Sequence, residues 1–211
     1  MKYFIYFAYL LLSLTPSFAQ KAVKKEQTPV KEYKHNNKFM LGLNVGSGFF
    51  SPTKANDILK ERYKGYIVTQ GTIEMIMHFD IGMDLTYRLN NYLDFQTLGE
   101  IFWAPKFINN DYYTYNKYSI GLLMNGHLPL GNARHSIFIG AGPFYHSYSF
   151  GLDEPTLKNG FSEELVNFRF LAGTNLNFGT FSPKIYIGYD MAGDYSSFLI
   201  GINPNFSLTG K

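Results

Sequence analysis

The sequence of 211 residues has no cysteine, a single tryptophan and few charged side chains. Without cysteine there are no disulfides, no thiolate metal sites and no cysteine nucleophile. Charged residues make up 17% of the chain, against roughly 25% in soluble domains. The net charge of +3 is too small to indicate a nucleic acid as partner. After residue 19, no apolar run reaches the length of a membrane-spanning helix, about 20 residues.

The first 19 residues have the organisation of a secretory signal peptide. Lys2 gives a positive start, residues 3–12 form a short apolar run, and Ser17-Phe18-Ala19 resembles a cleavage site with small residues at both ends. We therefore expect export and cleavage after Ala19. Residues 20–38 follow with six lysines and two glutamates, a net charge of +4. Because this segment has few apolar residues, we expect it to be basic and flexible.

From residue 39 onward the chain follows a period of two residues. In IEMIMHFDIGMDLTYR, residues 73–88, one alternate set is apolar, whereas the other carries five ionisable side chains. Such alternation predicts a strand with two unlike faces. We expect eight strands, over residues 38–50, 73–88, 92–103, 118–128, 136–150, 165–178, 183–191 and 197–208. Within the fifth, Pro143 has no N–H for the ladder and predicts a bulge or another irregularity.

Alternation alone does not decide which face lies inside a barrel. A soluble lipocalin-like barrel puts apolar side chains inward around a ligand, whereas a membrane barrel turns them outward into lipid. Here the polar faces are poor in Lys and Glu and rich in Gly, Asn and Ser, the strands reach about ten residues, and long connections alternate with short ones. These features favour an all-β fold, an eight-stranded antiparallel up-and-down transmembrane β-barrel over residues 39–208.

Two stretches carry a family resemblance. The hairpin DIGMDLTYRLNNYLDFQTLGEIFW and the strand IFIGAGPFYHSYSFG resemble parts of small outer-membrane β-barrel proteins of the porin-like superfamily, the OmpA/OmpX-like and PorT-like group of Bacteroidetes-type bacteria. The resemblance implies a place in the Gram-negative cell outer membrane, with outer-membrane lipid and the outer-membrane assembly machinery as partners. Members of the family commonly end on an aromatic residue that this machinery reads, whereas Phe206 is followed here by Ser-Leu-Thr-Gly-Lys. We expect no cofactor.

Ten ionisable residues lie on the polar faces of the predicted strands. Sets of Glu, His and Asp can bind a metal ion. The other interpretation is a plug of ion pairs, because buried charges need partners and three cations are available to neutralise the acids. We favour the plug and assign no metal ligand. The expected charge network inside the barrel consists of Glu74, His78, Asp80, Asp84, Arg88, Asp94, Glu100, Arg169, Lys184 and Asp190.

An eight-stranded barrel has an interior just filled by side chains, which favours a structural, adhesive or loop-mediated binding role. The binding segments would be 51–72, 105–117 and 151–164, facing an extracellular or periplasmic protein. The alternatives are a narrow porin-like channel, a barrel-embedded lipid A-modifying hydrolase and a soluble periplasmic lipocalin-like carrier. For a hydrolase, His146, Ser147, Ser149 and Glu154 are close in sequence, but His146 points to the opposite face from both serines. We therefore expect no enzyme and assign no catalytic residue.

Overall fold

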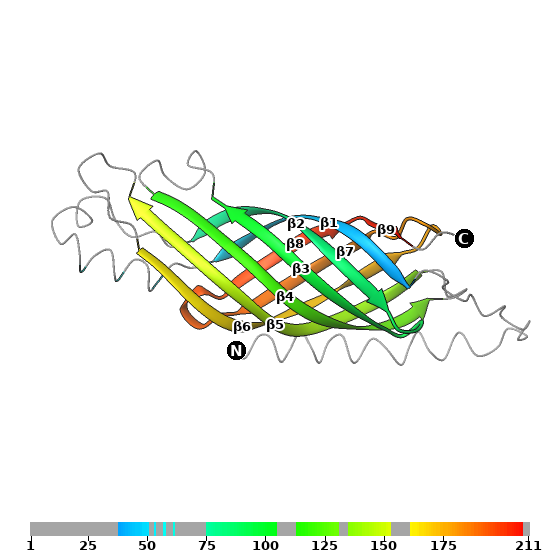
Figure 1. Cartoon of the computed structure of the whole chain (residues 1–211). Helices are drawn as coiled ribbons and strands as arrows, with labels where there is room; N and C mark the ends of the chain where they lie inside the picture. The colour runs from blue at the N-terminus through cyan, green and yellow to red at the C-terminus, as the bar shows by residue number, and fades with distance from the viewer. Residues whose placement is uncertain are drawn as a thin grey trace, which may run out of the picture. The chain divides into compact units, whose positions relative to one another are not determined.

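The computed structural model describes residues 38–50, 75–104, 113–130, 135–152 and 161–208, together with Thr53, Asp57 and Glu61. Consecutive strands pair antiparallel from β1 to β8, and β1 also pairs with β8, which closes the sheet into an eight-stranded barrel (Figure 1). The expected fold class is therefore confirmed. Among the described residues, no helix is both long and apolar enough to cross a membrane. The strands are β1 (Phe39–Phe50), β2 (Ile76–Arg88), β3 (Leu93–Trp103), β4 (Tyr113–Leu130), β5 (His135–Leu152), β6 (Phe161–Leu176), β7 (Lys184–Met191), β8 (Ser197–Asn203) and β9 (Asn205–Ser207).

The two ends of the barrel differ in their connections. Short connections, residues 89–92, 131–134 and 177–183, join the strands at one end, which we call the turn end. The connections 51–75, 104–112, 153–160 and 192–196 join them at the other, which we call the loop end. The link between β7 and β8, residues 192–196, is short, as the sequence predicted, and contains the 3₁₀ helix η1 (Gly193–Tyr195).

The last strand of the barrel is divided by Pro204. β8 and β9 pair with β1 in a single register, from Phe50↔Ser197 to Met40↔Ser207. Proline has no N–H to donate, but the carbonyl of Pro204 still accepts a hydrogen bond from the backbone N–H of Leu43 at 3.1 Å. The predicted strand 197–208 is therefore in the right place, and it is interrupted at one residue.

The proline in β5 leaves the register unchanged. Gly121↔Phe144 and Met124↔Ala141 lie on either side of it and belong to the same register between β4 and β5. No residue is inserted in β5, so the bulge suggested for Pro143 is absent. The irregularity is limited to two ladder positions between these pairs.

The two faces of the strands differ in the way a membrane barrel requires. On β2, His78, Asp80 and Asp84 are at most 3% exposed, whereas the outward residues between them are apolar, with Ile81 and Met83 exposed and Phe79 half-buried. The other strands also turn apolar residues outward, so an apolar belt covers the outside, and the inside holds the polar set together with buried apolar and aromatic side chains. On β5, whose facing the sequence did not predict, Phe144 and Tyr148 point inward, and Tyr145 points outward.

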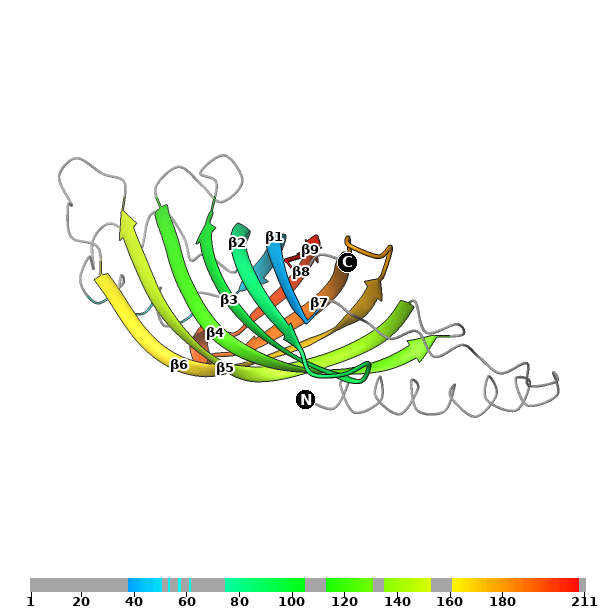
Figure 2. The ribbon, with the colours of Figure 1, turned by 45° about the vertical axis from the view of Figure 1, so that its right-hand side comes forward.

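Three neighbouring strands are longer than the sequence predicted. β4 begins at Tyr113 rather than 118, β5 continues to Leu152, and β6 begins at Phe161 rather than 165. β6 pairs with β5 along its whole length, but with β7 only from Phe168 onward. β4, β5 and β6 therefore extend past β7 at the loop end (Figure 2). Residues 113–117 and 161–164, which the sequence assigned to loops, belong to this part of the sheet.

Candidate functional site

The interior of the barrel is layered along its axis, and β3 passes through every layer. Its inward residues run from Asp94 near the turn end through Leu98 and Glu100 to Phe102 near the loop end. Asp94 belongs to a polar cluster, Leu98 to an apolar layer, Glu100 to an ion-pair layer and Phe102 to an aromatic cluster. Polar and apolar layers therefore alternate along the bore.

The ion-pair layer is built around Arg169 of β6, which is fully buried. Its Nε donates to Asp190 Oδ1 at 2.6 Å and its Nη2 to Asp190 Oδ2 at 3.1 Å. Its Nη1 donates to Glu100 on β3, across the bore. One guanidinium thus connects β6 with its neighbour β7 and with the distant β3. We call this layer the central layer; it comprises Asn44, Asp80, Glu100, Lys117, Arg169 and Asp190.

Lys117 and Asn44 add further bonds across the bore. Lys117 Nζ reaches from β4 to Asp190 Oδ2 on β7, at 2.8 Å. Asn44 on β1 donates through Nδ2 to Glu100 Oε1 at 2.7 Å and accepts a hydrogen bond from the Tyr186 hydroxyl on β7 at 2.7 Å. Because these bonds join strands that are not neighbours, the central layer connects the walls of the barrel through its middle.

Aromatic rings cover the two cations of the central layer. The Cζ of Arg169 lies 4.0 Å from the ring centre of Phe144, and Lys117 Nζ lies 4.2 Å from the ring centre of Phe102. A desolvated cation over an aromatic face gains about 2 kcal/mol. Buried ion pairs need such additional contacts, because Coulomb attraction alone often fails to offset the loss of hydration. We therefore expect the loss of any one member to destabilise the layer.

An aromatic cluster fills the interior toward the loop end. Tyr195 of η1 stacks on Tyr148, with ring centres 4.8 Å apart, and its hydroxyl donates to Glu163 Oε2 at 2.6 Å. Burial and the Glu163 carboxylate raise the pKa of Tyr195 well above its usual range, so this hydroxyl stays a donor at neutral pH. We call this set the mouth cluster; it comprises Phe50, Ile76, Phe102, Tyr115, Tyr148, Phe150, Ala192, Tyr195 and Leu199.

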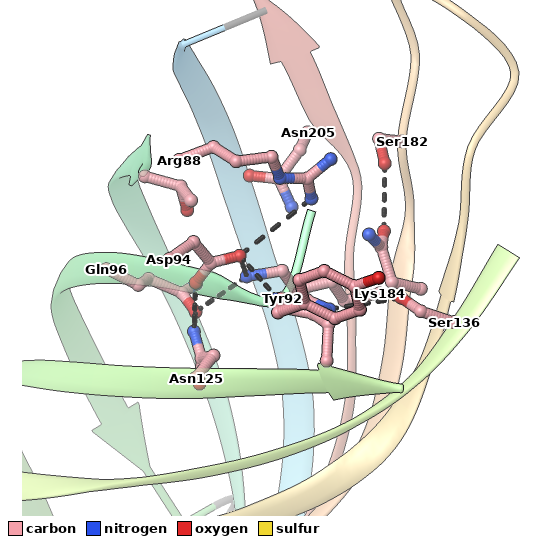
Figure 3. Close-up of polar contacts among 12 residues, drawn as sticks. Arg88, Tyr92, Asp94, Gln96, Asn125, Ser136, Ser182, Lys184 and Asn205 are labelled. Carbon is pink, nitrogen blue, oxygen red and sulfur yellow. Dashed lines mark hydrogen bonds and ion pairs between the residues drawn. The ribbon is translucent and has the colours of Figure 1, made fainter. Parts of the chain in front are cut away.

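Asp94 is the centre of a polar cluster at the turn end (Figure 3). Its carboxylate accepts a hydrogen bond from Asn125 Nδ2 at 2.6 Å and lies 2.7 Å from His127 Nε2. Lys184 Nζ lies 3.4 Å from Asp94 Oδ2, and Arg88 Nη2 lies 3.8 Å from the same oxygen. Since a carboxylate only accepts hydrogen bonds, His127 carries its proton on Nε2 here. Donors from three other strands thus surround one buried carboxylate.

Nine of the ten residues expected in the interior network are buried, each at most 5% exposed, and Glu74 lies outside the described residues. His78 stands apart from the ion pairs. Its ring packs edge-on against Phe102, with ring centres 5.1 Å apart, and neither ring nitrogen has a hydrogen-bond partner among the residues that the structure describes. Within the described ranges, no His, Asp and Glu side chains are grouped as they would be around a metal ion. The others divide between the central layer (Asp80, Glu100, Arg169 and Asp190) and the turn end (Asp84, Arg88, Asp94 and Lys184).

Sequence reasoning missed Lys117 and the role of the asparagines. Lys117 lies one residue before the predicted strand 118–128, so it was assigned to a loop. Asn125 binds Asp94, and Asn203 donates to Asp84 Oδ1 at 2.7 Å. The alternation placed asparagines on the polar faces, but it contained no signal for which carboxylate each one contacts.

The residues considered for a hydrolase do not form a site. His146 points inward, whereas Ser147 and Ser149 lie on the outer face, and Glu154 is outside the described residues. The inward His146 does meet a serine, since its Nδ1 lies 2.6 Å from Ser119 Oγ. Both residues are enclosed by the barrel wall. Because His146 is fully buried and Ser119 is 5% exposed, we interpret this contact as structural.

Comparison with solved structures identifies the architecture. The crystal structure of Neisserial surface protein A (NspA) matches with a TM-score of 0.59 at 12% identity, covering 81% of this chain and 97% of that chain. The chain has the fold of the small outer-membrane β-barrels. The N-terminal β-barrel domain of Pseudomonas aeruginosa OprF also matches, with a TM-score of 0.50 at 10% identity and the same coverage. No protein-family model and no curated protein matches the sequence.

Proposed function

We propose that the protein spans the outer membrane of a Gram-negative cell as a sealed barrel and binds other proteins through its loop end. The central layer carries the proposal. Arg169 is bonded to Glu100 and Asp190 on separate walls and occupies the place through which ions would have to pass. The apolar layer and the mouth cluster fill the bore toward the turn end and the loop end. These layers favour a closed barrel over a narrow channel.

The apolar belt supports the membrane location and also marks where the sheet leaves the lipid. On β4 the outward Tyr118 is followed toward the loop end by Asn116, and on β6 Val166 is followed by Glu164. Polar outward residues are suited to water rather than hydrocarbon. We call the part of the sheet beyond this change the raised sheet; it comprises residues 113–117 of β4, 147–152 of β5 and 161–165 of β6.

The raised sheet gives the loop end a firm support for recognition. Its inward side contributes to the mouth cluster, where Tyr148 stacks on Tyr195. Glu163 accepts a hydrogen bond from the Tyr195 hydroxyl. Binding residues are commonly carried at the ends of such rigid scaffolds. An external protein is therefore the partner that this arrangement favours.

The test combines conductance with binding. We expect the purified protein to give no stepwise conductance in planar bilayers. Stepwise conductance would instead favour the narrow channel. For binding, cells displaying the wild-type protein are applied to an array of extracellular proteins and compared with cells displaying a shortened variant. In that variant an Asn-Gly turn replaces residues 147–164, which leaves His146↔Leu165 as the last ladder pair.

We expect the wild-type cells to bind at least one member of the array and the shortened variant to lose that binding. Both proteins should keep the mobility difference between boiled and unboiled samples on a detergent gel, which reports a folded barrel. Equal binding by both would refute a role for the raised sheet.

A further inference from the structure

Before Phe168, β6 has a strand edge that no described strand covers; it runs along the raised sheet and continues to Val166. β6 pairs with β5 from Phe161 to Leu176, but with β7 only from Phe168 to Asn175. In an antiparallel sheet, the N–H and C=O of one residue point to the same neighbouring strand, and successive residues alternate. Leu176 donates its N–H to Pro183, on the β7 side, at 2.9 Å. Because the β5–β6 register is unbroken, the even-numbered residues of β6 all point to the β7 side.

Ser162, Glu164 and Val166 therefore direct their backbone groups toward this uncovered edge, which we call the β6 edge. Within the residues that the structure describes, their N–H and C=O groups have no hydrogen-bond partner. Unpaired strand edges readily take up an additional strand, and many proteins bind extended peptides in this way. Three consecutive edge-facing residues provide enough backbone groups for a short segment of this kind.

The charge of Glu164 makes a different protein a better partner for this edge than a second copy of the same chain. If two copies paired antiparallel over these three residues, Glu164 of each would lie opposite Glu164 of the other. Like charges directly opposite destabilise a strand pair, whereas opposite charges stabilise it. The second carboxylate here, Glu163, points inward to the Tyr195 hydroxyl, so among the described residues Glu164 is the one charged side chain on the outer face of the raised sheet.

We propose that the β6 edge binds an extended segment of a partner protein by strand addition. The segment has a basic residue opposite Glu164 and an apolar residue two positions away, opposite Val166, which is 71% exposed on the outer face. This inference rests on the proposed function, because it names the kind of partner that the loop end recognises. Backbone hydrogen bonds to the β6 edge supply most of the affinity, and the basic and apolar positions select the segment.

The probe is a fluorescent peptide of sequence Thr-Val-Thr-Lys-Thr-Val-Thr, and its binding to the protein in lipid nanodiscs is measured by fluorescence anisotropy. When Lys is opposite Glu164, the backbone groups of the Lys and Val residues face the β6 edge, and those of Thr face away. Methylating the backbone nitrogens of Lys and Val should therefore abolish binding. The matched control peptide carries its methyl groups on the inner Thr residues and should bind nearly as well as the parent.

Two variants at position 164 separate the contribution of the backbone hydrogen bond to binding from the contribution of the side-chain charge. Glu164→Pro removes an N–H that faces only the β6 edge, so the ladder to β5 keeps its bonds. We expect its affinity for the probe to fall about tenfold, the loss of roughly one well-formed hydrogen bond. Glu164→Gln keeps the N–H and removes the charge, so we expect its affinity for the probe to fall about threefold. Added salt screens the same charge and should lower the affinity of the wild type by a similar factor.

Each variant must first show the mobility shift of a folded barrel, and Ser162→Pro replaces Glu164→Pro if that variant fails to fold. The assignment is overturned if the wild type does not bind the probe, if methylation at Lys and Val has no effect, or if a folded proline variant binds like the wild type. The assignment to the β6 edge can also fail while the broader proposal stands. If array binding is lost in the shortened variant but kept by Glu164→Pro, the loop end binds a partner by other contacts.

Discussion

Arg169→Met tests whether the charges of the central layer depend on one another. Methionine keeps a long side chain but removes the guanidinium that bonds Glu100 and Asp190. Asp190 keeps Lys117 at 2.8 Å, whereas Glu100 keeps only the neutral amide of Asn44 among the hydrogen-bond donors that the structure describes. A buried carboxylate without a cation is costly, and breaking a buried pair typically removes about 3–5 kcal/mol. We expect the free energy of unfolding to fall by that amount.

The double variant Arg169→Met/Glu100→Gln separates charge from packing. The glutamine amide oxygen can still accept the Asn44 hydrogen bond, and the pair between Lys117 and Asp190 stays intact. We therefore expect the double variant to regain at least half of the stability lost by the single one. Lys38→Met serves as the control, since Lys38 is exposed just before β1 and such a change costs less than about 0.5 kcal/mol.

The assay is a denaturant titration in detergent micelles or lipid vesicles, followed by tryptophan fluorescence. The single tryptophan, Trp103, lies on the outer face of β3 near the loop end, so its emission reports the loss of the barrel. A loss below about 1 kcal/mol in Arg169→Met would refute the reasoning, because it would show that these ion pairs do not depend on each other. A double variant no more stable than the single one would assign the loss to packing.

Three further predictions concern the outer face, a close backbone contact and the loop end. Ile120→Arg on the apolar belt should cost about 2–4 kcal/mol on folding into vesicles, and an unchanged folding free energy would contradict the membrane location. Gly142→Ala should destabilise the protein, because its Cβ would collide with the backbone carbonyl oxygen of Leu122 on β4, whereas Gly99→Ala has open space and should be neutral or slightly stabilising; equal denaturation midpoints would contradict this. Tyr195→Phe removes the hydrogen bond to Glu163 and should cost about 1 kcal/mol at pH 8. Since the folded-state pKa of Tyr195 lies above its unfolded value of about 10, that advantage of the wild type should be complete below pH 10 and shrink above it, and a pH-independent difference would be the contrary result.

Strand positions, and the facing of every strand except β5, were predictable from the sequence because a period of two residues is a local signal. The second strand was expected over 73–88 and is described over Ile76–Arg88. The prediction failed at the loop end, where the alternation changes meaning. There the inward residues are aromatic, such as Tyr115 and Tyr148, and the outward residues are polar, such as Ser147. Outside the lipid, apolar residues face inward and polar residues face outward. The first residues of β4 and β6 therefore do not follow the pattern of the lipid-facing strands, and they were interpreted as loops.

The interior network was predictable in its members but not in its pairs. Alternation places Arg169 and Asp190 on inward faces, and they lie opposite each other on adjacent strands. The contact between Arg169 and Glu100 follows from no local pattern, because it crosses the bore and depends on the closed barrel. The same holds for Lys117, whose partner is 73 residues away in the chain.

The bonds of the central layer also bear on how the barrel forms. Tyr186 and Asn44, whose side chains are bonded, are 142 residues apart in sequence, and Arg169 meets both of its partners only when β3, β6 and β7 are all in place. A half-assembled sheet in hydrocarbon would leave these charged groups and its strand edges without partners, at a cost of several kcal/mol each. We therefore expect insertion to be cooperative, with the strands entering the membrane as one closing unit, because an incomplete barrel keeps charged interior groups without partners.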